Sequence, residues 1–268
     1  MITEAAISLL FLYPWNINTG VNYTIGDYST NRTYRSEKVV VSLDRRGRDT
    51  YVASYEHLTI EDDIGTYKQD NVLLRSSLWL RNEARIGMLG GYIQSNSIEE
   101  GWLLGAQIEG DLPWFGYSVD YTYEQFRRWD LTYYWIVSDF PISQWNFGLS
   151  RKIGILHVRA EALTQNSQST ENLRWLAKAT IDPGIDLAVT LYGSTGESRY
   201  AVDPYLLLID NNPDILNQSY GVYTTYRLTP NFTLSCEALR KEYSPRYDFI
   251  GITDYHVGYL GFGIQTRF

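Results

Sequence analysis

The stretch Leu260-Gly-Phe262-Gly-Ile264-Gln-Thr266-Arg-Phe268 alternates between large apolar residues and glycine or polar residues, and it closes on a phenylalanine. Successive side chains of a β-strand point to opposite faces of the sheet, so a period of two residues separates an apolar face from a polar one. The stretch therefore predicts a final strand with one apolar face and one face of small or polar residues.

This pattern resembles the closing strand of bacterial outer-membrane β-barrels, in which the terminal aromatic residue belongs to the signal read by the assembly machinery. The resemblance covers the nine residues 260–268. It implies a location in the bacterial outer membrane, with outer-membrane lipid and the barrel-assembly machinery as partners. Phe268 would then be the assembly signal.

The aromatic composition agrees with a protein that crosses a membrane. Aromatic residues make up 15% of the 268 residues, with 23 Tyr and 8 Trp against 9 Phe, so most rings carry a polar group. Such rings favour membrane interfaces. The mean hydropathy is -0.28, and the longest uncharged apolar stretch, residues 5–15, is too short for a helical span of about 20 residues. Strands fit better, because only every second residue of a barrel strand faces lipid.

Charge and cysteine content exclude several classes of partner. The net charge of -8 argues against a nucleic-acid partner, which requires a basic face. The single cysteine, Cys236, excludes an intramolecular disulfide and a cysteine-based metal cluster, and its apolar strand position predicts a lipid-facing side chain. No phosphate-binding glycine loop precedes a helical pattern, so we expect no cofactor and no metal.

The alternation of the last strand recurs along the whole chain, and segments rich in Pro, Gly and Asn separate its copies. Strand patterns occupy residues 17–25, 74–80, 84–92, 102–108, 117–123, 145–149, 156–162, 175–181, 185–191, 220–228, 232–238 and 260–268. Neither a sustained helical period nor a shift in composition marks a second domain. The sequence predicts an all-β fold, a single transmembrane antiparallel up-and-down β-barrel over residues 1–268.

The strand number follows from how two ambiguous segments are treated. Counting residues 17–25 as the first strand and 127–142 as one external excursion gives about 14 strands. Strands at 4–12 and 129–137 would raise the number to about 16, which we prefer because alternation continues in both segments. Both numbers are even, as a barrel with both termini at the periplasm requires.

If the apolar positions face lipid, the positions between them face the lumen and carry charges of both signs. The predicted pore-lining residues are Arg75, Arg81, Arg85, Gln107, Glu109, Asp120, Glu124, His157, Arg159, Glu161, Arg174, Lys178, Asp186, Arg227, Glu237 and Arg267. Barrels of about 16 to 18 strands leave an aqueous channel unless loops fold into them. The sequence thus predicts a porin-like channel with a mixed-charge lumen and weak ion selectivity, and not an enzyme.

Three alternatives remain open. The first is the barrel domain of an exopolysaccharide-export protein, because Trp79, Tyr134 and Tyr192 have inward parity and their rings could stack on sugars. No signal peptide is recognisable, so we expect Met1 to mark a trimmed start, with an N-terminal periplasmic domain or partner missing from this chain. The second alternative is an anchor subunit of a larger outer-membrane complex.

The third alternative is catalysis at a histidine. Outer-membrane phospholipases and lipid A deacylases place His and Ser two residues apart on a lipid-exposed face, and His57-Leu-Thr59 is the nearest match, with Thr for Ser and no recognisable orienting partner nearby. Omptin proteases use an Asp-x-His pair opposite two acidic residues. Asp254-Tyr-His256 has that spacing, and Glu61, Asp62 and Asp63 could supply the acids.

Overall fold

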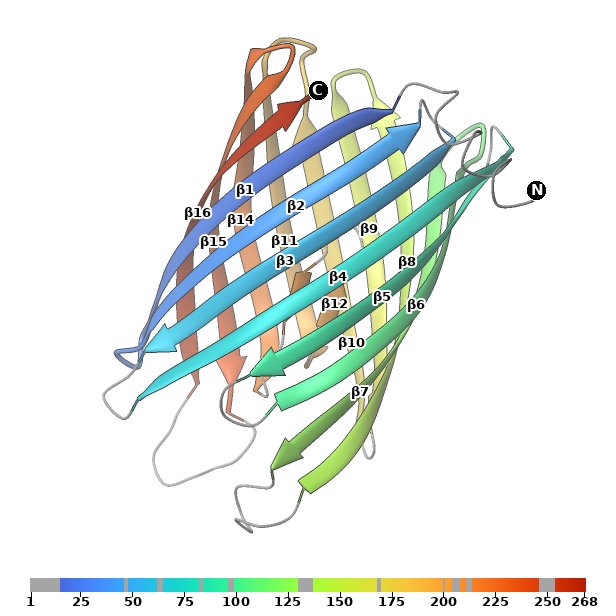
Figure 1. The fold of residues 1–268 in the computed structure, drawn as a ribbon. Coiled ribbons are helices and arrows are strands. Elements are labelled where there is room, and N and C mark those ends of the chain that lie inside the picture. Colours follow the sequence, from blue (N-terminus) through green and yellow to red (C-terminus); the bar gives the residue numbers. More distant parts are fainter. Residues whose placement is uncertain are drawn as a thin grey trace, which may run out of the picture.

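The protein is a closed antiparallel β-barrel in the computed structural model (Figure 1). The structure describes residues 15–45, 48–61, 65–81, 84–95, 99–129, 137–167, 170–199, 201–203, 208–210, 214–245 and 254–268. The barrel strands are β1 (Asn16–Tyr28), β2 (Thr33–Arg45), β3 (Asp49–Glu61), β4 (Thr66–Arg81), β5 (Ala84–Ser95), β6 (Glu99–Asp111), β7 (Gly116–Trp129), β8 (Val137–Ile153), β9 (Leu156–Ser167), β10 (Thr170–Ile181), β11 (Leu187–Ser198), β14 (Ile215–Thr229), β15 (Phe232–Ser244) and β16 (Tyr255–Arg267). Each pairs with the strands before and after it, which confirms the predicted fold class.

The barrel closes where the last strand meets the first. β16 pairs with β1 over eleven positions, from Asn18 opposite Arg267 to Tyr28 opposite Val257. The backbone of Phe268 continues this pairing, with its N–H donating to the carbonyl of Ile17 at 2.8 Å. The predicted final strand is confirmed, and its terminal phenylalanine lies at the seam with its side chain exposed.

Fourteen strands close the barrel, the lower end of the predicted range. The preference for 16 is corrected, because β1 pairs directly with β16 and closure needs no strand before Asn16. Of the two segments behind that preference, residues 4–12 and 130–136 lie outside the described residues. Residue 129 ends β7 and residue 137 begins β8, so these two residues belong to long strands on either side of the excursion.

Burial alternates along the strands as the sequence pattern predicts. On β4, Leu73 is 1% exposed whereas its neighbour Leu74 is 57% exposed. The exposed set holds most of the large apolar side chains, which is the arrangement of a surface meant for lipid. Cys236 belongs to the exposed set, in agreement with its prediction.

Short turns join the strands at the barrel end that carries the carboxyl terminus. The turn between β10 and β11 contains Gly184 with a φ of 76°, and its amide donates to the Asp182 side chain at 2.9 Å. The turn between β8 and β9 has Gly154 at a φ of 59°. Glycine adopts these left-handed angles without steric cost, so both turns are tight. No helix long and apolar enough to cross a membrane occurs among the described residues.

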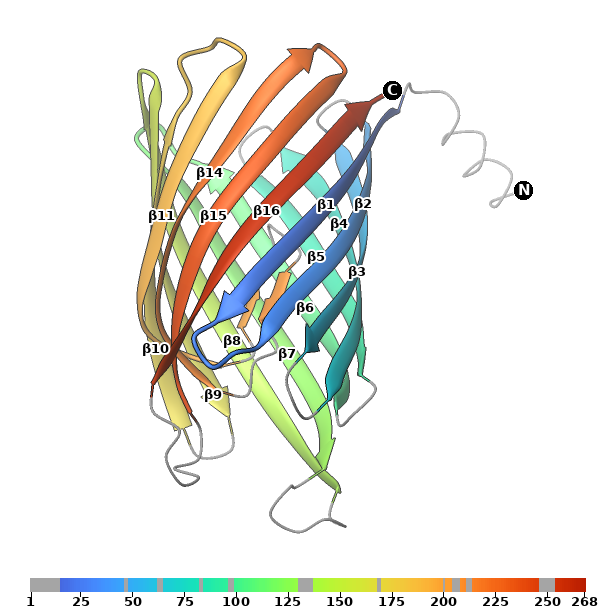
Figure 2. The same ribbon diagram turned by 90° about the vertical axis from the view of Figure 1, so that its left-hand side faces the viewer.

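A second, two-stranded sheet lies inside the barrel. The link from β11 to β14 contains β12 (Ala201–Asp203) and β13 (Leu208–Asp210), which pair antiparallel. Two views a quarter turn apart both show this pair of strands within the outline of the barrel (Figure 1, Figure 2). The face of the wall strands that contacts β12 is therefore the inner face, and we call the β12–β13 unit the inner hairpin.

Candidate functional site

Side-chain amides of the wall hold the inner hairpin by its backbone. Gln144 on β8 donates to the carbonyl of Val202 at 2.7 Å and accepts from the amide of Val202 at 3.2 Å. Gln165 on β9 makes the same pair of bonds with Arg199, two residues before β12, at 2.7 and 2.9 Å. A fifth bond, 3.1 Å long, joins the two glutamines to each other. Both glutamines are buried, so these bonds form away from water and fix the position of the hairpin.

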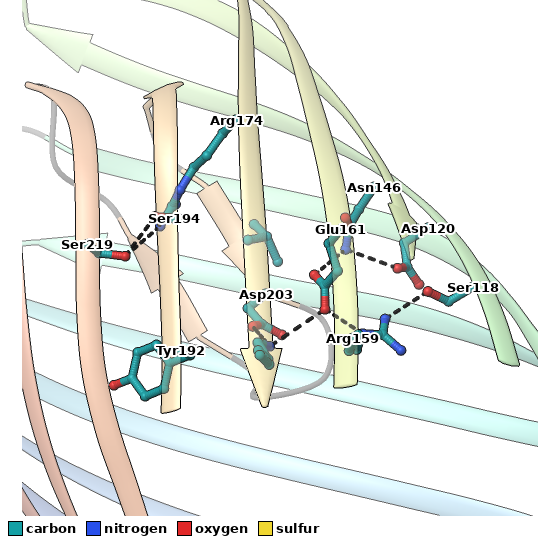
Figure 3. Close-up of polar contacts among 12 residues, drawn as sticks. Ser118, Asp120, Asn146, Arg159, Glu161, Arg174, Tyr192, Ser194, Asp203 and Ser219 are labelled. Atoms are coloured by element: carbon teal, nitrogen blue, oxygen red, sulfur yellow. Dashed lines mark hydrogen bonds and ion pairs between the residues drawn. The ribbon is translucent and has the colours of Figure 1, made fainter. Parts of the chain in front are cut away.

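Charged side chains of the inner wall meet beside the hairpin (Figure 3). Arg159 donates to Glu161 at 2.5 Å, and Lys178 lies 3.7 Å from the same carboxylate. Lys178 also lies 3.6 Å from Asp203 at the end of β12, so it links the wall to the hairpin. Glu161 is 4% exposed, whereas Arg159 and Lys178 are 19% and 24% exposed. One buried carboxylate is thus neutralised by two partly accessible cations.

The same polar layer continues onto β7 and β8. Asn146 donates to Asp120 at 3.4 Å and to Glu161 at 3.2 Å. Arg159 also donates to the hydroxyl of Ser118 at 2.8 Å. The structure therefore gathers four of the predicted pore-lining residues, Asp120, Arg159, Glu161 and Lys178, into one connected network.

Two further predicted residues, Arg174 on β10 and Glu237 on β15, have partners on β11 and β14. Arg174 donates to the hydroxyls of Ser194, Ser198 and Ser219, at 2.6, 3.2 and 3.1 Å. Glu237 accepts a hydrogen bond from the Tyr192 hydroxyl, which confirms the inward parity predicted for that ring.

Arg85, Gln107 and Glu109 form a smaller network toward the end with the short turns. Arg85 donates to Glu109 at 3.1 Å and also to Ser77. Its guanidinium lies 5.9 Å from the centre of the Trp79 ring, and Gln107 donates to Glu109 at 3.5 Å. This contact places Trp79 with the inner-face residues, as its parity predicts.

The remaining predicted residues that the structure describes are spread along the wall and its rims. Arg75 is half-buried on β4, and Glu124 is fully buried beside Leu103 and Ile142 in the strand register. His157 is exposed opposite Lys152 and Thr180. The rim residues are Asp186, which lies in the turn before β11 rather than in the wall, and the exposed Arg227 and Arg267. The side chain of Arg81 and all of Tyr134 lie outside the part of the chain that the structure describes.

An apolar patch on the inner wall was not predicted. It consists of Val52, Leu73, Leu89, Ile93, Leu103, Phe126 and Ile142 from β3 to β8, packed with Val202 of the inner hairpin. The available signal was consecutive apolar residues, as in Val72-Leu73-Leu74 and Trp102-Leu103-Leu104, where both faces of one strand are apolar. Such runs indicate a strand that is buried on both sides.

A group of tyrosines at the other side of the barrel was also missed. Tyr28, Tyr243 and Tyr255 are buried, and the rings of Tyr243 and Tyr255 stack at 5.3 Å between centres. Tyr34 and Tyr259 meet edge to face at 5.0 Å. We call this group the tyrosine cluster; it occupies the inner face near the ends of β1, β2, β15 and β16 that lie away from Phe268.

The structure describes some of the predicted catalytic residues and gives one of them an unexpected partner. Among the described residues, no group of three or more His, Cys, Asp and Glu is placed to hold a metal ion. For the protease alternative, Asp254 accepts a bond from Ser244 at 2.8 Å, while Asp62 and Asp63 lie outside the described residues. His57 differs from its prediction: it has an orienting partner, because its Nδ1 lies 2.9 Å from Asp70 Oδ1. Asp70 lies on the neighbouring strand, thirteen residues away, where spacing gave no signal.

Comparison with known proteins places the fold but not the substrate. No protein-family model and no curated protein matches the sequence. Among solved structures, the CymD monoaromatic hydrocarbon channel superposes with a TM-score of 0.61 at 6% identity, over 100% of this chain and 92% of that one. The toluene transporter TodX of P. putida gives 0.54 at 8% identity, over 94% and 89% of the two chains. The NanC porin gives 0.50 at 15%, over 92% and 100%.

The closed 14-stranded barrel is thus of the outer-membrane type. The three neighbours are described as a channel, a transporter and a porin. At these identities the likeness concerns the fold alone.

Proposed function

We propose that this protein is a passive channel of the bacterial outer membrane, in which the inner hairpin narrows the lumen. The observation that carries the proposal is the anchoring of that hairpin inside the barrel by Gln144 and Lys178, with Gln165 holding Arg199 just before it. A strand pair fixed at several points inside the wall reduces the open cross-section and defines a constriction. Diffusion past it requires no covalent chemistry in the lumen.

Charges of both signs lie beside this constriction, which supports a mixed-charge lumen. Arg159 and Lys178 are both partly accessible, and each lies within ion-pair distance of Glu161. Arg174, which donates to three serine hydroxyls, adds a further cation. Interleaved charge of this kind favours neither sign strongly, so we expect weak ion selectivity.

Planar-bilayer recording tests the proposal directly. The wild-type barrel, first shown to be folded by its altered gel migration without boiling, is expected to give steps of stable conductance. Replacing residues 201–210 by a Gly/Ser segment of equal length removes the inner hairpin and is expected to increase the step size. The matched control Leu74→Ala alters only the exposed face and is expected to leave the step size unchanged. Silence from folded wild-type protein contradicts the channel and favours an anchor role.

The tyrosine cluster favours export of a polysaccharide as a second candidate. Its rings gather on the inner face at one mouth of the barrel, and Tyr255 has its hydroxyl fixed by Asp214 at 2.7 Å. Aromatic faces are suited to stacking on sugar rings. Under this candidate, neutral oligosaccharides block the conductance of the wild type and block it less in Tyr259→Leu. Equal block in both proteins removes the support for sugar export.

A further inference from the structure

We propose that the outer wall of β3 and β4 carries a hydrolytic site for carboxylic esters of anionic lipids, with Thr59 as nucleophile, His57 as general base and Asp70 as its orienting acid. The site lies on the opposite side of the wall from the lumen. The inference therefore goes beyond the proposed channel, and it runs against the expectation that the barrel is not an enzyme.

The three side chains form a continuous hydrogen-bonded chain on one face. Asp70 Oδ1 lies 2.9 Å from His57 Nδ1, and His57 Nε2 lies 3.5 Å from Thr59 Oγ1. The carboxylate accepts from Nδ1–H, so the tautomer it favours leaves Nε2 free to accept the threonine proton. Asp70 Oδ1 also accepts from the Tyr55 hydroxyl at 2.5 Å, which holds the carboxylate from a second side.

Accessibility distinguishes this chain of residues from the networks of the lumen. His57 and Asp70 are 37% and 45% exposed, whereas Glu161 in the lumen is 4% exposed. Thr59 is half-buried on the same face, two residues along β3 from His57. A substrate can therefore reach the hydroxyl and the imidazole from outside the barrel. The spacing from Thr59 Oγ1 to Nε2 is long for a hydrogen bond, as is usual before substrate binds.

The site lies where the outer wall changes from apolar to polar. Toward Phe268 from this level, the outward residues are Val39, Val41 and Leu43 on β2, Tyr51 and Tyr55 on β3, and Val72, Leu74 and Leu78 on β4, all exposed. At the level of the site, Glu37, His57 and Asp70 stand side by side in the register. On three neighbouring strands the outward side chains thus change from apolar to charged at the same level, which marks the edge of the hydrocarbon layer.

Lipid esters lie at this same depth, between the acyl chains and the head groups. Figure 1 shows the end of β3 at the opposite end of the barrel from the carboxyl terminus. We take both termini to lie at the periplasm, as expected for a barrel with an even number of strands, so the row faces the outer leaflet. An acyl ester in that leaflet would reach Thr59 without leaving the membrane.

Two cations flank the proposed nucleophile and select for anionic lipid. Arg35 on β2 and Lys68 on β4 stand directly opposite Thr59 in the register, and both are exposed. Their charges would attract a phosphorylated head group and stabilise the negative oxygen that develops when the ester carbonyl is attacked.

The proposed reaction is an ordinary two-step ester hydrolysis. Thr59 Oγ bonds to the carbonyl carbon while its proton passes to His57 Nε2, and the ester C–O bond breaks as the leaving alcohol takes that proton. Water then attacks the acyl-threonine and gives its proton to Nε2. The fatty acid leaves, and Thr59 Oγ recovers the proton. One ester and one water give one acid and one alcohol, with no change of oxidation state.

Fatty-acid release by the folded barrel in detergent micelles tests the proposal, with phosphatidylglycerol in one arm and lipopolysaccharide in the other. We expect release in at least one arm, and the arm that responds identifies the lipid. Thr59→Val and His57→Ala should each lower the rate about 100-fold or more, as loss of a nucleophile or a general base does. Thr59→Ser should retain activity, because serine keeps the hydroxyl.

Thr33→Val is the matched control, because Thr33 is an exposed threonine of β2 near the same end of the barrel, outside the proposed site. It should leave the rate unchanged. An alkyl fluorophosphonate should label Thr59 in the wild type and not in Thr59→Val, and bilayer conductance should be the same in both. No release in either arm from folded wild-type protein, or equal release from Thr59→Val, overturns the proposal and leaves the channel proposal untouched.

Discussion

The inner wall has an apolar side on β3 to β8 and a polar side on β7 to β11, and the inner hairpin contacts both. Val202 packs against the apolar side, while its neighbour Asp203 pairs with Lys178 on the polar side. Adjacent residues of a strand point in opposite directions, so a strand of three residues can serve two unlike walls at once. The comparison teaches that the position of the hairpin is specified by two independent kinds of contact.

The largest loss of stability is expected on the apolar side of the inner wall, where two adjacent leucines of β4 can be compared. Leu73→Ala removes a fully buried side chain and leaves a cavity, so the free energy of unfolding should fall by about 3–5 kcal/mol. Leu74→Ala should cost only about 2 kcal/mol for the lost transfer, because lipid fills the space on the outside. Urea titration in lipid vesicles measures both. Equal losses would show that the inner patch is not tightly packed.

The polar side should respond next when Glu161 is changed. Glu161→Gln keeps the shape but removes the charge that Arg159 and Lys178 share, which should cost about 1–3 kcal/mol in the same titration. Of its two ion-pair partners among the described residues, Lys178 would then retain Asp203 of the hairpin. A variant as stable as the wild type would mean that water already solvates the two cations.

A somewhat smaller loss is expected when the hairpin anchor is cut. Gln144→Ala leaves the amide and carbonyl of Val202 without their side-chain partner, at a cost of about 1–2 kcal/mol. Amide hydrogen exchange at Val202 should accelerate at the same time. Unchanged protection there would indicate that packing against the apolar side alone holds the hairpin.

The smallest effect is expected at the single bond between Tyr192 and Glu237. Tyr192→Phe removes the hydroxyl and keeps the ring, so the loss should be about 1 kcal/mol. Ser235→Ala, on the same strand as Glu237, is a control that leaves this bond intact. A loss of several kcal/mol would show that Tyr192 supports more of the wall than this one contact.

Residue alternation was enough to predict the closed barrel, the seam strand and the parity of Tyr192 and Trp79. Alternation assigns a side chain to a face, and it held for Arg159, Glu161 and Lys178. It could not predict the inner hairpin, because the position of a link depends on contacts such as Gln144 with Val202, which are 58 residues apart. The inward position of Leu73 and Phe126 was also missed, because every apolar residue was expected to face lipid.

The partnership of His57 and Asp70 was invisible for a related reason. The two residues face each other only because β3 and β4 pair in a particular register, with His57 directly opposite Asp70. A shift of one residue would turn Asp70 to the other face of the sheet. The register of β3 against β4 depends on all the contacts between these two strands. A local motif such as His57-Leu-Thr59 therefore does not indicate which residue of β4 lies opposite His57.

The seam between β1 and β16 has a consequence for folding speed. Thr19 and Thr266 bond across it at 2.7 Å although 247 residues separate them along the chain. Until those strands meet, the growing sheet has two edges with unpaired backbone groups that can pair with another chain. Such a long-range contact is slow to form because so much chain must be ordered first. The barrel is therefore most prone to aggregation before closure, while the edges of β1 and β16 are unpaired.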